Sequence, residues 1–207
     1  MARIRHSWFL PVLAGVLASS ACTHSLFSSA NPAADRSRPV VRIETRGGVE
    51  YGVTTTDGIL FLGRTATEGP CRVHLFLGAT PTPLIEDGSI EPAGSVFYRV
   101  DFDLKTMAVP LLERDLSAED NLVAIPFTGP FVTSEVPVRL AQNDAIEGDV
   151  IEWPGRELAV GTGVFVREQD RLFCAGMVAA GLELQGTRYL ALAGSSSIRE
   201  LIATPRP

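Results

Sequence analysis

The sequence predicts an all-β fold, a barrel or a sandwich, placed after an export signal and a tether. Short runs of β-branched and aromatic residues recur from residue 40 onward, and turn residues separate them at nearly regular intervals. Only the C-terminal end has a helical pattern. With 45% hydrophobic and 20% charged residues, the 207-residue chain can bury a core, which excludes a wholly disordered protein.

The N-terminal segment has the features of a bacterial lipoprotein signal. Two arginines precede the apolar run Trp8–Leu17. A membrane-spanning helix takes about 20 apolar residues, so this shorter run predicts a cleaved signal peptide over residues 1–21. The following Cys22 resembles the lipidated cysteine of a lipobox, although Ser19 stands where that motif usually has Leu. Cleavage by signal peptidase I after Ala21 is the alternative.

Lipidation of Cys22 predicts export to the bacterial cell envelope, with the membrane as a partner and the domain facing the periplasm or the cell surface. Residues 22–38 are rich in Ser, Ala and helix breakers, which predicts a flexible tether. A coil of this length spans roughly 20–24 Å. The net charge of −6 argues against a nucleic-acid partner, because tracking phosphates requires a basic surface.

The predicted strands fill the body of the chain. The segments with strand composition are 40–44, 49–55, 58–62, 72–77, 95–102, 107–112, 122–127, 136–140, 149–153, 163–167, 172–180 and 189–192. Proline inside three of them predicts edge strands or bulges, at Pro110, Pro126 and Pro137. A polar segment, 113–121, divides the body into a first β-rich half, 39–116, and a second half, 117–207, that includes the helix.

One short helix is predicted at the C-terminal end. Ser197 and Glu200 have the spacing of a capping box, in which each side chain satisfies a backbone N–H at the helix start. Ile198 and Leu201 form an apolar face, and Pro205 ends the helix.

The last third of the chain contains an ordered series of motifs. A Gly-rich turn leads into Gly163-Val-Phe-Val166, then come Gly176-Met-Val-Ala-Ala-Gly181, a strand with Tyr189, and the helix. This order resembles the second barrel of the trypsin-like serine peptidases, which have the chymotrypsin fold. The likeness covers roughly residues 45–203 and is clearest from residue 150. It implies two six-stranded antiparallel β-barrels with a short C-terminal helix; a single β-sandwich is the alternative.

The resemblance also locates the positions of a catalytic triad. In that family a His oriented by an Asp activates a Ser nucleophile. Matching Gly163-Val-Phe165 to the family's Pro-Val-Phe places Val160 in the Ser position. Thr65 stands in the His position, and Asp103 is the one triad residue retained. We therefore expect no catalytic residues, and interpret the domain as a degenerate peptidase, or pseudoprotease.

Histidine is too scarce for most hydrolytic or metal chemistry. His74 is the only imidazole in the predicted folded part. It alternates with Val73 and Leu75, which predicts an exposed position on a strand. Cys71 and His74 do not form a zinc site, because residues three apart in a strand point to opposite faces. We expect no metal and no cofactor, and no nucleotide-binding motif is present.

The two cysteines of the body, Cys71 and Cys174, leave two alternatives open. An oxidising compartment favours a disulfide between them. Two separate buried thiols are the other interpretation, because a free cysteine packs like a small apolar residue.

Three functions follow from these patterns. The leading hypothesis is a lipid-anchored, non-catalytic trypsin-like domain that binds a peptide, a protein or an envelope component, in the former substrate groove. The second is an active endopeptidase with His74 as its base. The third is an unrelated structural lipoprotein with a β-sandwich. Acidic pairs such as Glu86–Asp87 and Asp101–Asp103 leave a carboxylate-based enzyme formally open.

Overall fold

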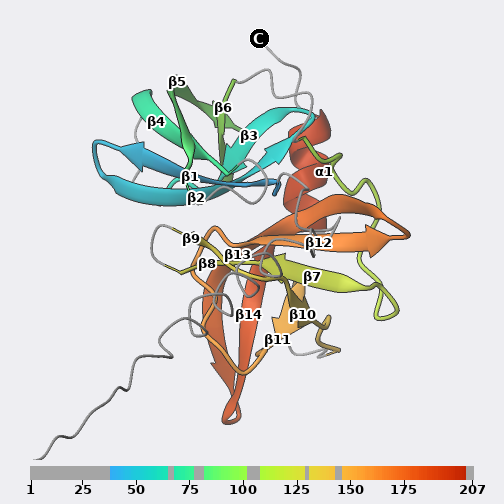
Figure 1. The fold of residues 1–207 in the computed structure, drawn as a ribbon. Helices are drawn as coiled ribbons and strands as arrows, with labels where there is room; N and C mark the ends of the chain where they lie inside the picture. Colours follow the sequence, from blue (N-terminus) through green and yellow to red (C-terminus); the bar gives the residue numbers. More distant parts are fainter. Residues whose placement is uncertain are drawn as a thin grey trace, which may run out of the picture. The chain divides into compact units, whose positions relative to one another are not determined.

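The first six strands of the computed structural model form a closed antiparallel barrel (Figure 1). The structure describes residues 38–64, 68–76, 82–101, 108–128, 131–142 and 146–203, all within one compact unit. The barrel strands are β1 (Val40–Thr45), β2 (Gly48–Thr55), β3 (Gly58–Phe61), β4 (Gly69–Leu75), β5 (Leu84–Ala93) and β6 (Phe97–Val100). Their order is β1-β2-β3-β6-β5-β4, and β4 pairs with β1 to close the barrel.

The second half repeats this topology. Its sheet contains β7 (Leu122–Ile125), β10 (Val136–Val138), β11 (Val150–Glu152), β12 (Gly163–Glu168), β13 (Arg171–Leu184) and β14 (Thr187–Ala193), in the order β10-β7-β12-β13-β14-β11. A bridge between Leu140 and Ile151 joins the two outer strands, with Ala141 N donating to Val150 O at 2.7 Å. The short pair β8 (Phe127–Thr128) and β9 (Phe131–Val132) follows β7.

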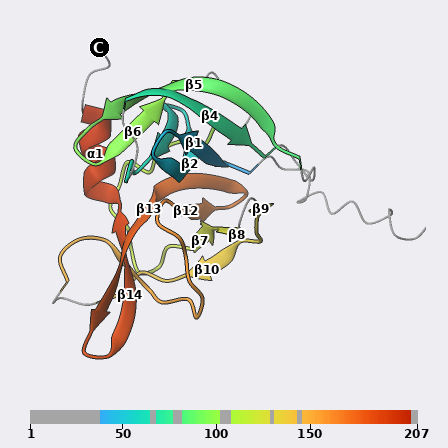
Figure 2. The same ribbon diagram turned by 90° about the vertical axis from the view of Figure 1, so that its left-hand side faces the viewer.

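If β7, β10, β11, β12, β13 and β14 are counted as the first to the sixth strand of the second half, each strand has the same neighbours as the corresponding strand of the first barrel. The predicted two-barrel architecture is confirmed, and the single β-sandwich is wrong. Figures 1 and 2 show the β13–β14 hairpin extending away from the first barrel, beyond the neighbouring strands of its own sheet. Among the described residues, no helix has the length and apolar character needed to cross a membrane.

Three apolar clusters hold the fold together. Each barrel has its own interior cluster, and a third cluster lies between them and draws residues from both. Strand β1 shows how the alternation of side chains produces this arrangement: Val41 and Ile43 point into the first barrel, while Val40 joins the shared cluster. Phe165 of β12 is fully buried in the same shared cluster.

Strand β5 was not predicted, because its sequence has little apolar signal. Most of its side chains are exposed, including Leu84 and Ile85, and only Ile90 and Ala93 are buried. Gly88, which is typical of a turn, is required here by packing: a Cβ on it would lie 2.6 Å from Val100 Cγ1. The strand forms because it pairs with β4 on one edge and with β6 on the other.

The strand predicted over residues 107–112 is not present in its described part, 108–112. Only isolated bridges occur there, from Thr55 to Val109 and from Leu111 to Cys174. These bridges place the connection between the barrels alongside strands of both. Residues 102–107 lie outside the described part of the chain.

The C-terminal helix α1 (Ser195–Ala203) begins two residues before Ser197, the residue predicted as its N-cap. Ser197 therefore lies in the first turn of the helix and does not cap it. Asp149, which precedes β11, caps the helix instead: Ser195 N donates to Asp149 Oδ2 at 2.6 Å. The carboxylate of Glu200 accepts from the backbone N and the hydroxyl of Ser95, at 3.1 and 2.6 Å, in the turn between β5 and β6. The helix therefore joins the two barrels.

The segment between the barrels is held by a cluster of charges. Both amino groups of Arg114 donate to the carboxylate of Asp120, at 2.9 and 2.7 Å, and Arg114 also reaches Glu168 at 2.9 Å. Ser117 N donates to Asp120 at 2.7 Å. The Arg114 guanidinium lowers the pKa of Asp120 below the ordinary value of 3.8.

We predict that Asp120→Asn lowers the free energy of unfolding at neutral pH by about 1–2 kcal/mol, because two charge-assisted hydrogen bonds are lost. A carboxyl whose pKa is lowered by folding stabilises the folded state above its ordinary pKa, and this contribution disappears as pH falls through the lowered value. The difference between the variant and the natural protein should therefore shrink below pH 3.8. Urea unfolding at neutral and acidic pH measures it.

Asp87→Asn is the matched control for this experiment. Asp87 is 90% exposed and lies 3.7 Å from an exposed Arg72, so its loss should change stability by less than about 0.5 kcal/mol. Equal effects of the two substitutions, or an effect of Asp120→Asn that persists in acid, would contradict the role given to Asp120.

Candidate functional site

Val160 is the only one of the predicted triad positions that the structure describes. Thr65, Asp103 and the proposed lipidation site Cys22 all lie outside the described residues. The convergence of Thr65, Asp103 and Val160 in one cleft therefore stays a prediction.

The turn that carries Val160 is fixed by contacts of its backbone. Gly161 has a φ of 87°, and a Cβ at this position would lie 2.5 Å from the carbonyl oxygen of Tyr51 in β2. Only glycine fits such a close approach. Gly161 N also donates to Val178 O of β13 at 2.8 Å. The half-buried Val160 thus lies where the second barrel meets β2 of the first.

The end of β3 is held in a comparable way. Leu62 packs against the shared cluster between the barrels. Gly63 has a φ of 46°, and a Cβ on it would fall within 2.1 Å of the Tyr98 ring. These two residues direct the chain toward the segment that contains Thr65, and the need for Gly63 was not evident from the sequence.

The hydroxyl group nearest in sequence to Val160 is not exposed. Thr162 is 1% exposed, and its Oγ1 has no hydrogen-bond partner among the described residues. Its backbone carbonyl accepts from Val178 N at 3.0 Å, which holds it in the sheet. Thr162 therefore presents no accessible hydroxyl next to the Val160 turn.

His74 lies on the outer face of β4, as its alternation with Val73 and Leu75 predicted, but it is only 9% exposed. The exposed position predicted for it is wrong because Arg42 and Glu44 of the neighbouring β1 lie against the imidazole. Arg42 Nη1 and Glu44 Oε1 each lie 3.4 Å from His74 Nε2. The hydrogen bond from Arg42 to Glu44, at 2.6 Å, lowers the pKa of Glu44.

The environment of His74 differs from that of a catalytic base beside a nucleophile. Within the described residues its polar contacts are with Arg42 and Glu44, both in the first barrel. The imidazole thus lies beside the Arg42–Glu44 ion pair, whereas a catalytic base would lie beside the hydroxyl or thiol that it activates.

The two body cysteines are free, so the predicted disulfide is wrong and the alternative of two separate thiols is correct. Cys71 packs inside the first barrel, while Cys174 belongs to the shared cluster. Burial raises the pKa of Cys71, and it raises the pKa of Cys174 to about 12. Both thiols act as apolar packing groups.

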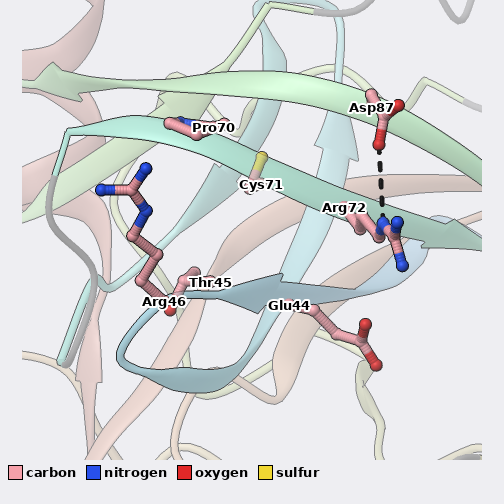
Figure 3. Close-up of a pocket in the computed structure, with 7 residues that line it drawn as sticks. All are labelled: Glu44, Thr45, Arg46, Pro70, Cys71, Arg72 and Asp87. Atoms are coloured by element: carbon pink, nitrogen blue, oxygen red, sulfur yellow. Dashed lines mark ion pairs between the residues drawn. The ribbon is translucent and has the colours of Figure 1, made fainter.

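A shallow pocket of about 310 Å³ opens on the first barrel, where the pairing of β1 with β4 ends at Glu44 and Arg72 (Figure 3). Its lining combines charges of both signs with a buried thiol: Glu44, Thr45, Arg46, Pro70, Cys71, Arg72 and Asp87. Arg72 lies 3.7 Å from Asp87 across the strands. The two acidic and two basic side chains of the lining balance in formal charge. No group of His, Cys, Asp and Glu in the described residues is arranged to hold a metal.

The most distinctive site is an edge of β13 that pairs with no strand among the described residues. Residues from Arg171 to Met177 pair with β12, and those from Met177 to Leu184 pair with β14. On the β12 side, the described contacts stop at Val178, which bonds the turn of Gly161 and Thr162. Beyond that point, β13 continues with no described strand beside it.

The pairing also shows which backbone groups face this edge. Val178 N donates away from β14, to Thr162 O, and Leu192 N donates away from β13, to Asp149 O at 2.9 Å. Hydrogen-bonding direction alternates along an antiparallel pair. A bulge at Val178–Ala180 shifts the register. After it, the next residues of β13 whose backbone N–H and C=O groups face away from β14, toward the open side, are Gly181 and Glu183.

The surroundings of Gly181 are open. A Cβ added to Gly181 would have no neighbouring atom within 4 Å, and both Gly181 and Glu183 are exposed. The open edge begins at the turn that carries Val160, since Gly161 bonds Val178. An unpaired strand edge can take up an extended peptide as an added strand. We refer to β13 residues 179–184 as the open edge.

Comparison with solved structures identifies the architecture. The serine protease of a human pathogenic astrovirus matches with a TM-score of 0.52 at 10% identity, over 78% of this chain and 96% of that one. The inactive form of the Rv3671c protease of M. tuberculosis matches at 0.51 and 15% identity, over 80% and 88%. A serine endoprotease from Yersinia pestis matches at 0.50 and 15% identity, over 78% of this chain and 61% of that one.

These likenesses establish the chymotrypsin-like two-barrel fold, as the sequence resemblance implied, and at such low identity they concern the fold alone. No protein-family model matches the sequence, and no relative is found among curated proteins.

Proposed function

We propose that this protein is exported and lipid-anchored, and that its trypsin-like domain binds an extended peptide without cleaving it. The observation that carries the proposal is the open edge of β13, which starts beside the Val160 turn. Binding needs only the backbone groups of that edge, whereas cleavage needs an activated nucleophile.

The residues at the nucleophile position argue against cleavage. The side chain of Val160 has no atom that can attack a carbonyl, and the Thr162 hydroxyl next to it is buried. The position that matches the family's His carries Thr65, which cannot act as an imidazole base. His74 contacts an ion pair in the first barrel.

The open edge supplies the hydrogen bonds of a docked strand. Gly181 and Glu183 each present one N–H and one C=O to the open side, by the alternation of the β13–β14 pair. A peptide strand antiparallel to β13 would satisfy these groups. Each such bond contributes about 0.5–1.5 kcal/mol net, so main-chain pairing alone predicts modest affinity with little sequence selectivity.

We predict that Gly181→Pro weakens peptide binding about tenfold, because proline removes the N–H and fills the space beside the edge. The Gly181 N–H does not pair with β14, so an edge proline leaves the hairpin ladder intact. The matched variant Gly181→Ala keeps the N–H and adds a methyl group in open space, so its effect should be much smaller.

Fluorescence anisotropy with short synthetic peptides of mixed sequence measures both variants, and circular dichroism verifies that they fold. Equal affinities for the natural protein and Gly181→Pro would show that peptides do not bind at the open edge.

An activity-based fluorophosphonate probe tests the absence of cleavage directly. We expect no labelling of the natural protein, since a fluorophosphonate reacts with a serine only when a neighbouring base activates it. Trypsin labelled in parallel is the positive control. Labelling of a serine in this chain, located by peptide mass spectrometry, would establish an active peptidase in place of a binding domain.

Export and anchoring rest on the sequence of the first 38 residues. A lipid on Cys22 would hold the tether at the membrane, and the tether would end at Arg38. The Arg38 guanidinium donates to the carbonyl oxygen of Thr133 in the second half. This contact supports Arg38 as the residue at which the proposed tether would end and the folded domain would begin.

We predict that the protein expressed in a bacterial host partitions with membranes and carries lipid on Cys22. The Cys22→Ser variant should be released from the membrane fraction while its domain stays folded. Intact-protein mass spectrometry decides the result: an unmodified N-terminus at Cys22 would show cleavage by signal peptidase I and no anchor.

A further inference from the structure

The side chains beside the open edge indicate which peptides it would select, an inference that rests on the function proposed above. Side chains alternate along a strand, so Ala180, Leu182 and Leu184 share one face of β13. Leu182 is paired with Tyr189 of β14. The opposite face contains Leu190, which is 2% exposed and belongs to the interior of the second barrel. The face of Leu182 therefore points outward.

This outward face is apolar next to the open edge. Ala180 is exposed, and Leu182, Leu184 and Tyr189 are each partly exposed. We call these four residues the apolar strip. The hairpin charges Glu183 and Arg188 are paired with each other in the register and lie on the other face, where Arg188 stacks at 5.7 Å over the Trp153 ring.

A charged residue of the neighbouring strand β11 shares the outward face, but it lies on the far side of the strip. Glu152 of β11 is paired with Tyr189, which in turn is paired with Leu182, so Tyr189 lies between Glu152 and the open edge. A strand added at the open edge would meet the small and apolar side chains of β13 first.

The pairing geometry sets the pattern of such a strand. The peptide residue opposite Gly181 would point to the same side as Gly181, toward the barrel. Its two neighbours, opposite Ala180 and Leu182, would point outward and extend the apolar strip. Because Ala180 is small and exposed, the position opposite it has room for a larger side chain.

The geometry points to an extended segment with apolar side chains at alternate positions as the peptide that the open edge binds. This is the pattern of a half-buried β-strand, so the partner is a strand-like segment of another protein that is unpaired when it binds. The backbone of Gly181 and Glu183 holds the segment, and the apolar strip selects it.

The test compares two peptides of equal composition. One alternates Ser and Val, and the other has the same residues in two blocks; both end in Lys for solubility. Anisotropy with the full chain should give about threefold to tenfold tighter binding of the alternating peptide. Leu182→Thr should remove most of this preference while keeping a residue that favours strands.

Val49→Thr is the matched control, since Val49 is 44% exposed on β2 of the first barrel and lies outside the apolar strip. It should keep the preference for the alternating peptide. Thermal unfolding of both variants identifies any loss of folded protein, and Leu184→Thr provides a second variant of the strip if Leu182→Thr does not fold.

The outcomes separate this inference from the proposed function. If both peptides bind equally and Gly181→Pro weakens both, the edge binds peptides but the apolar strip does not select them, which overturns the inference alone. If neither peptide binds, the proposed function fails as well. If sedimentation shows a dimer that Gly181→Pro dissociates, a second copy of the chain occupies the edge, which overturns the inference.

Discussion

The packing between the two barrels is the constraint on which the site depends. Strands β1 and β12 are buried on both faces: Val41 and Val164 point into their own barrels, while Val40 and Phe165 meet in the shared cluster. A strand with two different buried faces cannot slip by one residue, because the slip would exchange the two sets of side chains. The register of β12 therefore fixes the turn before it, and with it Val160.

Polar contacts secure the segments that have no regular apolar pattern. Asp149 and Glu200 hold helix α1 to the second and first barrels respectively. The Arg114 cluster does the same for the connection between barrels. Each of these charge-assisted hydrogen bonds contributes about 1–2 kcal/mol at most, so the contacts matter chiefly for position. They keep loops and helix in place around a core whose stability comes from apolar burial.

Much of the fold was predictable from strand periodicity, and the errors have physical causes. Strand β5 was missed because closure of the barrel supplies its stability through pairing on both edges, which leaves its sequence free of a strong apolar pattern. The helix start was misplaced because its cap is Asp149, a residue remote in sequence. His74 is buried by side chains of a neighbouring strand, which alternation within one strand cannot reveal.

The site was predictable only in part. The motif around Gly163 located the Val160 turn, since that information is local. The open edge of β13 was not predicted, because an edge depends on how far a partner strand extends: β12 begins at Gly163, while β13 runs on to Leu184. The one indication in the sequence was that the strand predicted over residues 172–180 is longer than the one predicted over residues 163–167.

Gly161 has a consequence for how this sequence can change over time. The Gly161 backbone holds the turn in shape. It lies so close to the Tyr51 carbonyl oxygen that there is no room for a Cβ, and its N–H donates to the carbonyl oxygen of Val178. The side chain of the preceding residue has no part in those contacts. Selection for a folded barrel therefore preserves Gly161 but does not protect the identity of residue 160. At the nucleophile position proposed for residue 160, a lineage could therefore exchange a nucleophile for valine by neutral drift, while the scaffold and its strand edge stay available for another use.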